Sequence, residues 1–100
     1  MYERKILLAF IRLHILYHAA NDKGIYGAGM IQELQSHGYN ISPGTLYPIL
    51  HDMTSHQLLT VSKENVNGKQ RKQYIITKKG IELLAQLRRY VIELSQEILR

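Results

Sequence analysis

Apolar residues recur every three or four positions in four stretches of the chain, a spacing typical of helices. Two runs rich in β-branched and aromatic residues lie before the last stretch and predict strands. Asn67 and Gly68 separate these runs and favour a tight turn with positive φ, which makes a hairpin. The predicted elements are helices over 3–20, 26–37, 43–56 and 78–99 and a hairpin over 59–76, in one domain spanning 1–100 that is mainly α with a small β-hairpin.

The first and last helices carry more apolar surface than one small domain can cover. The first has a stripe at four-three-four spacing and is apolar around nearly its whole circumference, so it must be buried on more than one side. We expect a second copy of the chain to cover the surplus, against the alternative that the last helix folds back on the first two. The residues expected at this dimer interface are Phe10, Leu13, Tyr17, Leu84, Leu87, Val91, Leu94 and Ile98.

The start of the third helix is the most specialised segment. Ser42 is a preferred N-cap residue, and Pro43 occupies the first helical position, where its missing N–H is not needed. Pro48 lies deeper and removes the hydrogen bond to the carbonyl of Gly44, a defect that costs roughly 3 kcal/mol inside a helix. A local rule broken in this way indicates a functional surface.

A helix, a short connection, a capped helix and a basic hairpin together predict a winged helix-turn-helix. In that layout the capped helix enters the DNA major groove, and cations on the hairpin neutralise phosphates. Tyr47 and His51 are four residues apart and share a face of the capped helix. Tyr47 is expected either to donate its hydroxyl to DNA or to pack its ring on the wing.

Charge and composition agree with a nucleic-acid partner. The net charge of +5 and the pI of about 9.6 favour polyanions such as double-stranded DNA. The lack of Cys excludes disulfides and thiolate chemistry and fits a reducing cytoplasm. The apolar run over 6–11 is interrupted by Arg12 and His14 and is too short for export or membrane insertion. We therefore expect a cytoplasmic protein without a membrane partner.

Few residues suggest catalysis or metal binding. His14 and His18 have the spacing of a helical metal pair, but with no Cys and no evident carboxylate nearby they are interpreted as a surface or interface pair. His51 and Asp52 lack an oxyanion loop, which argues against a hydrolase. We expect no enzymatic activity, no metal and no cofactor. The aromatic residues of the two interface helices could instead line a cavity for a small aromatic effector: Tyr2, Phe10, Tyr17 and Tyr90.

Two blocks of sequence resemble the PadR family of bacterial transcription regulators. One is Ser-Pro-Gly-Thr-Leu-Tyr-Pro with the following apolar residues, over 42–50, and the other spans 68–80 at the wing and the start of the last helix. The similarity covers about 5–90 and implies a dimeric winged helix-turn-helix repressor whose third helix and wing bind operator DNA. Carried over by position, the DNA-binding residues are Ser42, Gly44, Thr45, Tyr47, Pro48 and His51 on the helix and Lys69, Arg71, Lys72 and Tyr74 on or beside the wing.

The chain departs from that family pattern at three points. The second helix opens with Tyr26 and Gly27 where relatives have a Gly-Tyr pair, so an aromatic of the DNA-facing side is absent unless Tyr26 replaces it. Gln57 stands where a glycine usually follows the recognition helix, so that turn is expected to differ. No Trp is present, which does not support the tryptophan-stacked ligand pore of some multidrug-sensing relatives. The chain ends at Arg100, as in the family's short members.

The sequence is also compatible with two other functions. A winged helix with a basic face can bind an acidic protein instead of DNA. A dimer with an aromatic cavity can act mainly as a ligand sensor, with DNA binding as its output.

Overall fold

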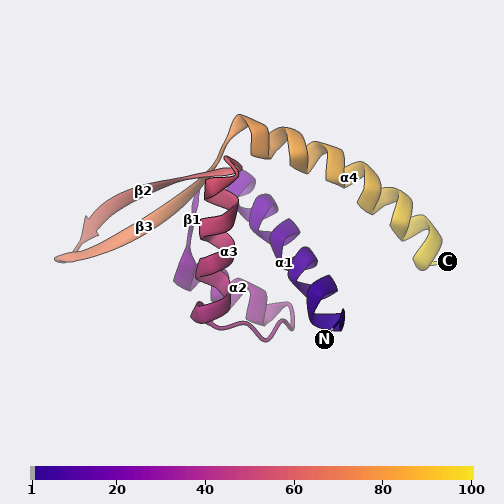
Figure 1. Ribbon diagram of the computed structural model, residues 1–100, viewed down its shortest axis with the longest axis horizontal. Coiled ribbons are helices and arrows are strands. Elements are labelled where there is room, and N and C mark those ends of the chain that lie inside the picture. Colours follow the sequence, from indigo (N-terminus) through magenta and orange to yellow (C-terminus); the bar gives the residue numbers. More distant parts are fainter. Residues whose placement is uncertain (1) are drawn as a thin grey trace.

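Apolar residues of the first three helices and of the sheet form one core. The three helices lie beside one another next to the base of the sheet (Figure 1). The computed structural model describes residues 2–100. Its buried side chains include Ile15, Leu34, Leu46, Leu50 and Leu59, which are almost completely removed from water. The predicted fold class, mainly α with a small β-hairpin, is confirmed. The elements are α1 (Tyr2–Asn21), β1 (Ile25–Tyr26), α2 (Gly27–Ser36), α3 (Pro43–Ser55), β2 (Leu59–Val66), β3 (Lys69–Ile76) and α4 (Lys78–Ile98).

The hairpin of β2 and β3 projects from the helical body as a wing (Figure 1). Asn67 and Gly68 form its two-residue turn with φ of 53° and 79°, as the Asn-Gly signal predicts. A third strand, β1, pairs with β3 and gives the order β1-β3-β2. The predicted second helix began at Tyr26, but this residue is extended and belongs to β1. Two residues are too few to show strand periodicity, so only the pairing reveals this strand.

The helix α2 ends where Gly38 adopts a left-handed conformation with φ of 94°. The Gly38 N–H donates to the Gln35 carbonyl, and the Tyr39 N–H donates to the Leu34 carbonyl, each at 3.0 Å. These two bonds define a Schellman motif.

The helix α3 ends in the same motif, although its left-handed residue is Gln57 with φ of 64°. The Gln57 N–H donates to the Thr54 carbonyl and the Leu58 N–H to the Met53 carbonyl, each at 3.0 Å. The expectation that Gln57 changes this turn is therefore wrong. The turn has the same hydrogen bonds as the one at Gly38, and Gln57 adopts the left-handed backbone conformation despite the strain that its Cβ causes.

Replacing Gln57 by Gly should stabilise the protein. A left-handed conformation costs a non-glycine residue about 1–2 kcal/mol, part of which the greater entropy of unfolded glycine offsets. We expect the free energy of unfolding to rise by about 0.5–1 kcal/mol, measured by chemical denaturation. Gly38→Gln is the matched control, because an added Cβ there meets open space and only the backbone strain changes. It should lower the stability; a change of the same sign in both variants would contradict the argument.

The helix α4 begins against the end of α3. The Thr77 side chain accepts a hydrogen bond from the Gly80 N–H at 2.9 Å and so caps the helix. Its hydroxyl also lies 2.7 Å from the Gln57 carbonyl, and the Thr77 N–H donates to the Leu58 carbonyl at 3.0 Å. A side chain at Gly80 would collide with that Leu58 carbonyl, so only glycine allows this approach.

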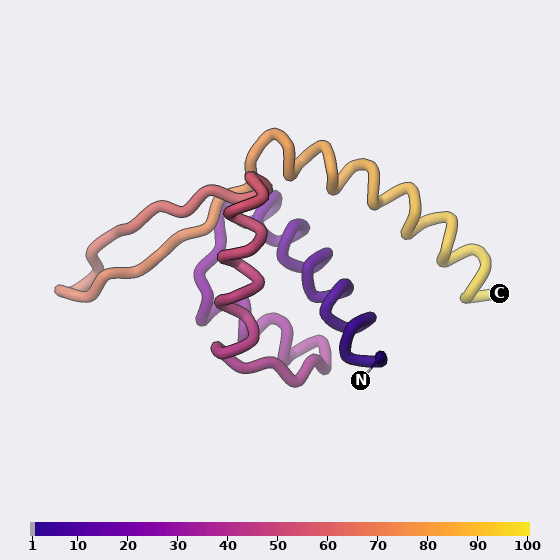
Figure 2. The backbone as a smooth tube through the Cα atoms, viewed as in Figure 1, coloured from indigo at the N-terminus to yellow at the C-terminus, as the bar shows by residue number. Residues whose placement is uncertain are grey.

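Beyond its first turns, α4 leaves the helical body (Figure 2). Leu83, Leu84 and Leu87 pack against the core, whereas Leu94 is 44% and Ile98 66% exposed. Within residues 2–100, no helix combines the length and the apolar character needed to cross a bilayer.

Candidate nucleic-acid interface

The start of α2, the exposed side of α3 and the wing enclose an open groove of about 570 Å³. The three residues that open α2 line one wall, and residues of α3 and β3 line the others. The lining residues are Tyr26, Gly27, Ala28, Gly29, Tyr47, Gln70, Arg71 and Lys72. The groove therefore brings residues of the predicted recognition helix and of the predicted wing to one surface.

Tyr47 lines this groove with 42% of its surface exposed. Its ring lies directly over Gly27, so closely that a Cβ at Gly27 would overlap the ring. The ring thus packs on the start of α2. This contact leaves part of the ring open to the groove.

Gly27→Ala should displace the Tyr47 ring, because the new methyl group occupies its place. The ring can swing toward solvent, so we expect a loss of about 1 kcal/mol of stability, at the low end for overpacking, and weaker DNA binding. Gly29→Ala is the matched control, since a Cβ there meets nothing within 4 Å. It leaves the Tyr47 ring in place and should raise stability by up to about 1 kcal/mol. Thermal unfolding and DNA titration of both variants check this; equal behaviour would mean that the ring position is unimportant.

Arg71 is held in place at the groove by two partners. Its Nη2 donates to Glu64 Oε1 at 3.0 Å, and its guanidinium carbon lies 3.7 Å from the centre of the Tyr26 ring. The Tyr26 hydroxyl donates to the same carboxylate oxygen at 3.0 Å. Hydrogen bonds from Arg71 and then from Tyr26 lower the pKa of Glu64, and the bond to Glu64 raises that of Arg71. Tyr26 therefore supplies an aromatic to this surface, where the family's Gly-Tyr pair is missing.

The wing also carries two lysines directly opposite each other, Lys63 on β2 and Lys72 on β3. Both are exposed, and like charges in this register destabilise a hairpin. Lys69 lies across from the uncharged Val66. An arrangement that concentrates positive charge at a cost in stability is typical of a surface that meets a polyanion.

The first turn of α3 departs from the expected cap. Ser42 is at the N-cap position, but its hydroxyl accepts no hydrogen bond from the helix; its carbonyl instead accepts from the N–H groups of Thr45 and Leu46. The hydroxyl is thus left for another partner. Arg4 of α1 donates to Thr45 Oγ1 at 3.1 Å, so its guanidinium lies beside the first turn of α3. Sequence reasoning missed Arg4, because no local pattern connects positions so far apart.

The remaining predicted DNA contacts divide into two groups. Gly44, Pro48 and His51 are exposed on α3, as a contact surface requires. Tyr74 is only 5% exposed and belongs to the core, so its prediction as a DNA contact is wrong. It pairs with Ile25 of the short strand that the sequence did not reveal, and this pairing explains its burial. Burial also raises the pKa of the Tyr74 hydroxyl.

A second groove, of about 660 Å³, lies between α1 and α4, and we call it the interhelical groove. Five of the residues predicted for the dimer interface line it: Phe10, Leu13, Tyr17, Leu84 and Val91. Of the other three, Leu87 packs against the core of its own chain, while Leu94 and Ile98 are exposed farther along α4. Tyr2 and Tyr90, expected beside an aromatic cavity, are exposed and do not line this groove.

His14 and His18 lie on the wall of the interhelical groove together with His37 from the end of α2. Burial lowers the pKa of His14, and the nearby His37 and His18 lower it further. Both effects disfavour the charged ring, whereas the nearby Glu33 favours it.

A recognition helix, a basic two-stranded wing and a bracing second helix define a winged helix-turn-helix protein. Comparison with known proteins extends this assignment. The model of the family described as "Transcriptional regulator PadR-like family" matches residues 15–86, which is more than half of the chain. The chain belongs to this family, whose members are transcriptional regulators and not enzymes.

Known relatives agree with that membership. Transcriptional regulator Rv3488 of Mycobacterium tuberculosis is 45% identical over 96 residues, covering 96% of this chain and 89% of its own. The crystal structure of a PadR-like transcriptional regulator (BC4206) from Bacillus cereus superimposes with a TM-score of 0.83 at 28% identity, covering 94% of this chain and 92% of that one. A PadR-like transcription factor from Bacteroides fragilis shares the fold with a TM-score of 0.82 at 24% identity, over 97% and 94% of the two chains.

Proposed function

We propose that this regulator is a cytoplasmic homodimeric repressor that binds a pseudo-palindromic operator through α3 and the wing. The observation that carries the proposal is the groove in which Tyr47 of α3 meets Arg71 and Lys72 of the wing beside the opening residues of α2. Polar and cationic groups from three elements converge there on an exposed surface. The chemistry of that surface suits a DNA backbone with base edges next to it.

Each part of this surface has its own role in the proposal. The start of α3 enters the major groove with Ser42, Thr45, Tyr47 and His51, while Gly44 and Pro48 keep the backbone close to the bases. Lys69, Arg71 and Lys72 contact phosphates. The first N–H groups of α2 have no side-chain cap and lie in the same groove, so a phosphate can accept from them.

Dimerisation follows from the apolar surface that the single chain leaves open. Phe10 and Tyr17 on α1 and Leu94 and Ile98 on α4 are large apolar residues with more than a third of their surface exposed. A second copy that covers them produces a two-fold dimer, with half-sites about one helical turn apart.

Fluorescence anisotropy with DNA from upstream of the protein's own gene, beside a scrambled duplex at two salt concentrations, tests the function. We expect tight binding to the upstream DNA that is only partly lost at the higher salt. Equal and steeply salt-dependent binding to both duplexes would show only charge attraction. Absence of binding to either would contradict the proposal and favour the alternative in which the winged helix binds an acidic protein.

The interhelical groove supports a second candidate function, the binding of a small aromatic effector. Phe10 and Tyr17 line its wall, with leucine and valine side chains across from them. A planar apolar molecule fits a site of this composition. Titration of the protein with planar aromatic dyes, followed by tyrosine fluorescence, tests it: quenching that Tyr17→Ala removes supports the site, and quenching unchanged in that variant places the dye elsewhere.

A further inference from the structure

Three histidines converge at the wall of the interhelical groove. His14 and His18 lie one turn apart on α1, and His37 caps the C-terminal end of α2. One ring nitrogen from each lies within 4.8 Å of the other two. The rings of His14 and His37 stack with their centres 4.8 Å apart. The cluster therefore joins two helices through groups that commonly bind metals.

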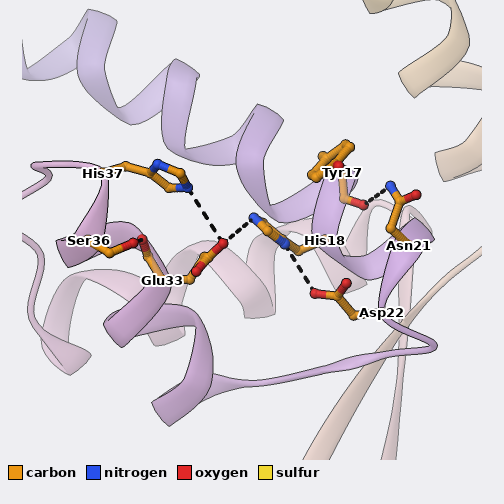
Figure 3. Close-up of polar contacts among 7 residues, drawn as sticks. All are labelled: Tyr17, His18, Asn21, Asp22, Glu33, Ser36 and His37. Carbon is orange, nitrogen blue, oxygen red and sulfur yellow. Dashed lines mark hydrogen bonds and ion pairs between the residues drawn. The ribbon is translucent and has the colours of Figure 1, made fainter.

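A carboxylate completes this cluster. Glu33 Oε1 lies 3.1 Å from His18 Nε2 and 3.5 Å from His37 Nε2, and Figure 3 shows both rings turned toward it. The interpretation of His14 and His18 as a surface or interface pair rested partly on the lack of a nearby carboxylate, and the structure contradicts that premise. The Nε2 atoms of His18 and His37 both face this carboxylate oxygen. Each contact is favourable only if the nitrogen carries a proton, or if a cation lies between the nitrogens and the oxygen.

His18 is also oriented from its other side. Its Nδ1 lies 3.1 Å from Asp22 Oδ2, one turn farther along the chain (Figure 3). A carboxylate at Nδ1 holds the proton on that nitrogen and leaves Nε2 free as a ligand. This outer contact is a regular companion of histidines that bind metals.

We propose that His14, His18 and His37, with Glu33 as the fourth ligand, form a binding site for Zn²⁺ or a related late transition-metal ion. Three imidazoles and one carboxylate suit such an ion, which prefers tetrahedral coordination. With metal–nitrogen distances near 2.0–2.1 Å, the ligand nitrogens lie about 3.3 Å apart. The nitrogen separations, which are at most 4.8 Å, must then close by no more than about 1.5 Å. Ring and side-chain rotations can supply this change, because His37 is exposed and Glu33 half-buried.

The plain alternative is a metal-free network of histidine–carboxylate pairs on the protein surface. The same chain offers a matched example of such a pair: His56 Nδ1 lies 3.4 Å from Asp52 Oδ1 with the same four-residue spacing as His18 and Asp22. His56 is the C-cap residue of α3. Among the described residues it does not belong to the group of histidines whose nitrogens converge. It therefore serves as a control for any histidine that binds Zn²⁺ without a built site.

Isothermal titration calorimetry of the full chain with Zn²⁺, without DNA, tests the site. We expect one ion per chain and at least a tenfold loss of affinity in His18→Gln and in Glu33→Gln. Asp22→Asn should weaken binding by about 10–100-fold, through the orientation of His18. His56→Gln should bind as the wild type does. No binding, or equal losses in His18→Gln and His56→Gln, would overturn the proposal.

A measurement on the unaltered protein keeps the test independent of variant folding. The ring resonances of all five histidines are followed by NMR as Zn²⁺ is added. Those of His14, His18 and His37 should shift together, and those of His51 and His56 should stay. Shifts centred on His51 or His56 would refute the site. Neither experiment uses DNA, so its failure would leave the proposed operator binding untouched.

Discussion

Leu94→Asp combined with Ile98→Asp is expected to give a folded monomer that binds a full operator at least 100-fold more weakly than the wild type. Both side chains are exposed in the single chain, so the charges do not enter its core. In the proposed dimer they would be buried without partners, which prevents association. A monomer contacts one half-site at a time and loses the gain of two linked contacts, a factor of about 10²–10⁴.

Analytical ultracentrifugation and circular dichroism separate the outcomes of this test. Gln96→Asp is the control, because it adds a charge to an exposed position on the opposite side of α4 and should leave the dimer intact. Leu87→Asp should unfold the protein instead, since Leu87 packs against the core of its own chain. A stable dimer of the double variant would place the subunit contact away from α4.

Lys72→Glu is expected to change DNA affinity and stability in opposite directions. The substitution removes a phosphate contact and puts a negative charge at the groove, so affinity should fall by about 10–100-fold for all sequences, with a flatter salt dependence. In the free protein the new carboxylate faces Lys63, and an opposed pair replaces a like-charged one. The hairpin should gain about 0.2–1 kcal/mol, observed as a higher midpoint of unfolding.

Lys69→Glu is the matched control for that variant. It alters the net charge by the same amount, but its cross-strand neighbour is Val66, so no ion pair forms. It should weaken DNA binding without a gain in stability. If Lys72→Glu leaves the affinity unchanged, the wing lies away from the phosphates; if both variants gain stability alike, the effect comes from net charge and not from the Lys63 pair.

Features encoded by neighbouring residues could be predicted from the sequence. The Asn-Gly turn depends on two adjacent positions, and it is present as predicted. The Thr77 cap and the left-handed Gly38 are equally local features. The apolar surplus of α1 and α4 was also visible, because helical periodicity assigns residues to faces without any knowledge of the tertiary contacts.

Features that depend on distant contacts were not visible. The burial of Tyr74 depends on its pairing with Ile25, and the Arg4–Thr45 bond joins the first helix to the third. The Glu33 carboxylate beside His18 comes from α2, so the spacing on α1 gave no hint of it, whereas Asp22, four residues after His18, is a local neighbour in the sequence. The Ser42 hydroxyl shows the converse: the residue type favours capping, but the side chain takes no part in it.

The attachment of α4 to the end of α3 has a mechanical consequence. Thr77 and Gly80 fix the root of α4 against the Leu58 carbonyl, which ties this long arm to the residues that follow the recognition helix. An arm of 21 residues is about 32 Å long, and a tilt of 10° at one end displaces the other by about 5–6 Å. That exceeds the 3.4 Å rise of one base pair. In a dimer joined through α4, a small change of angle between the two arms therefore alters which half-site spacing the pair of recognition helices can span.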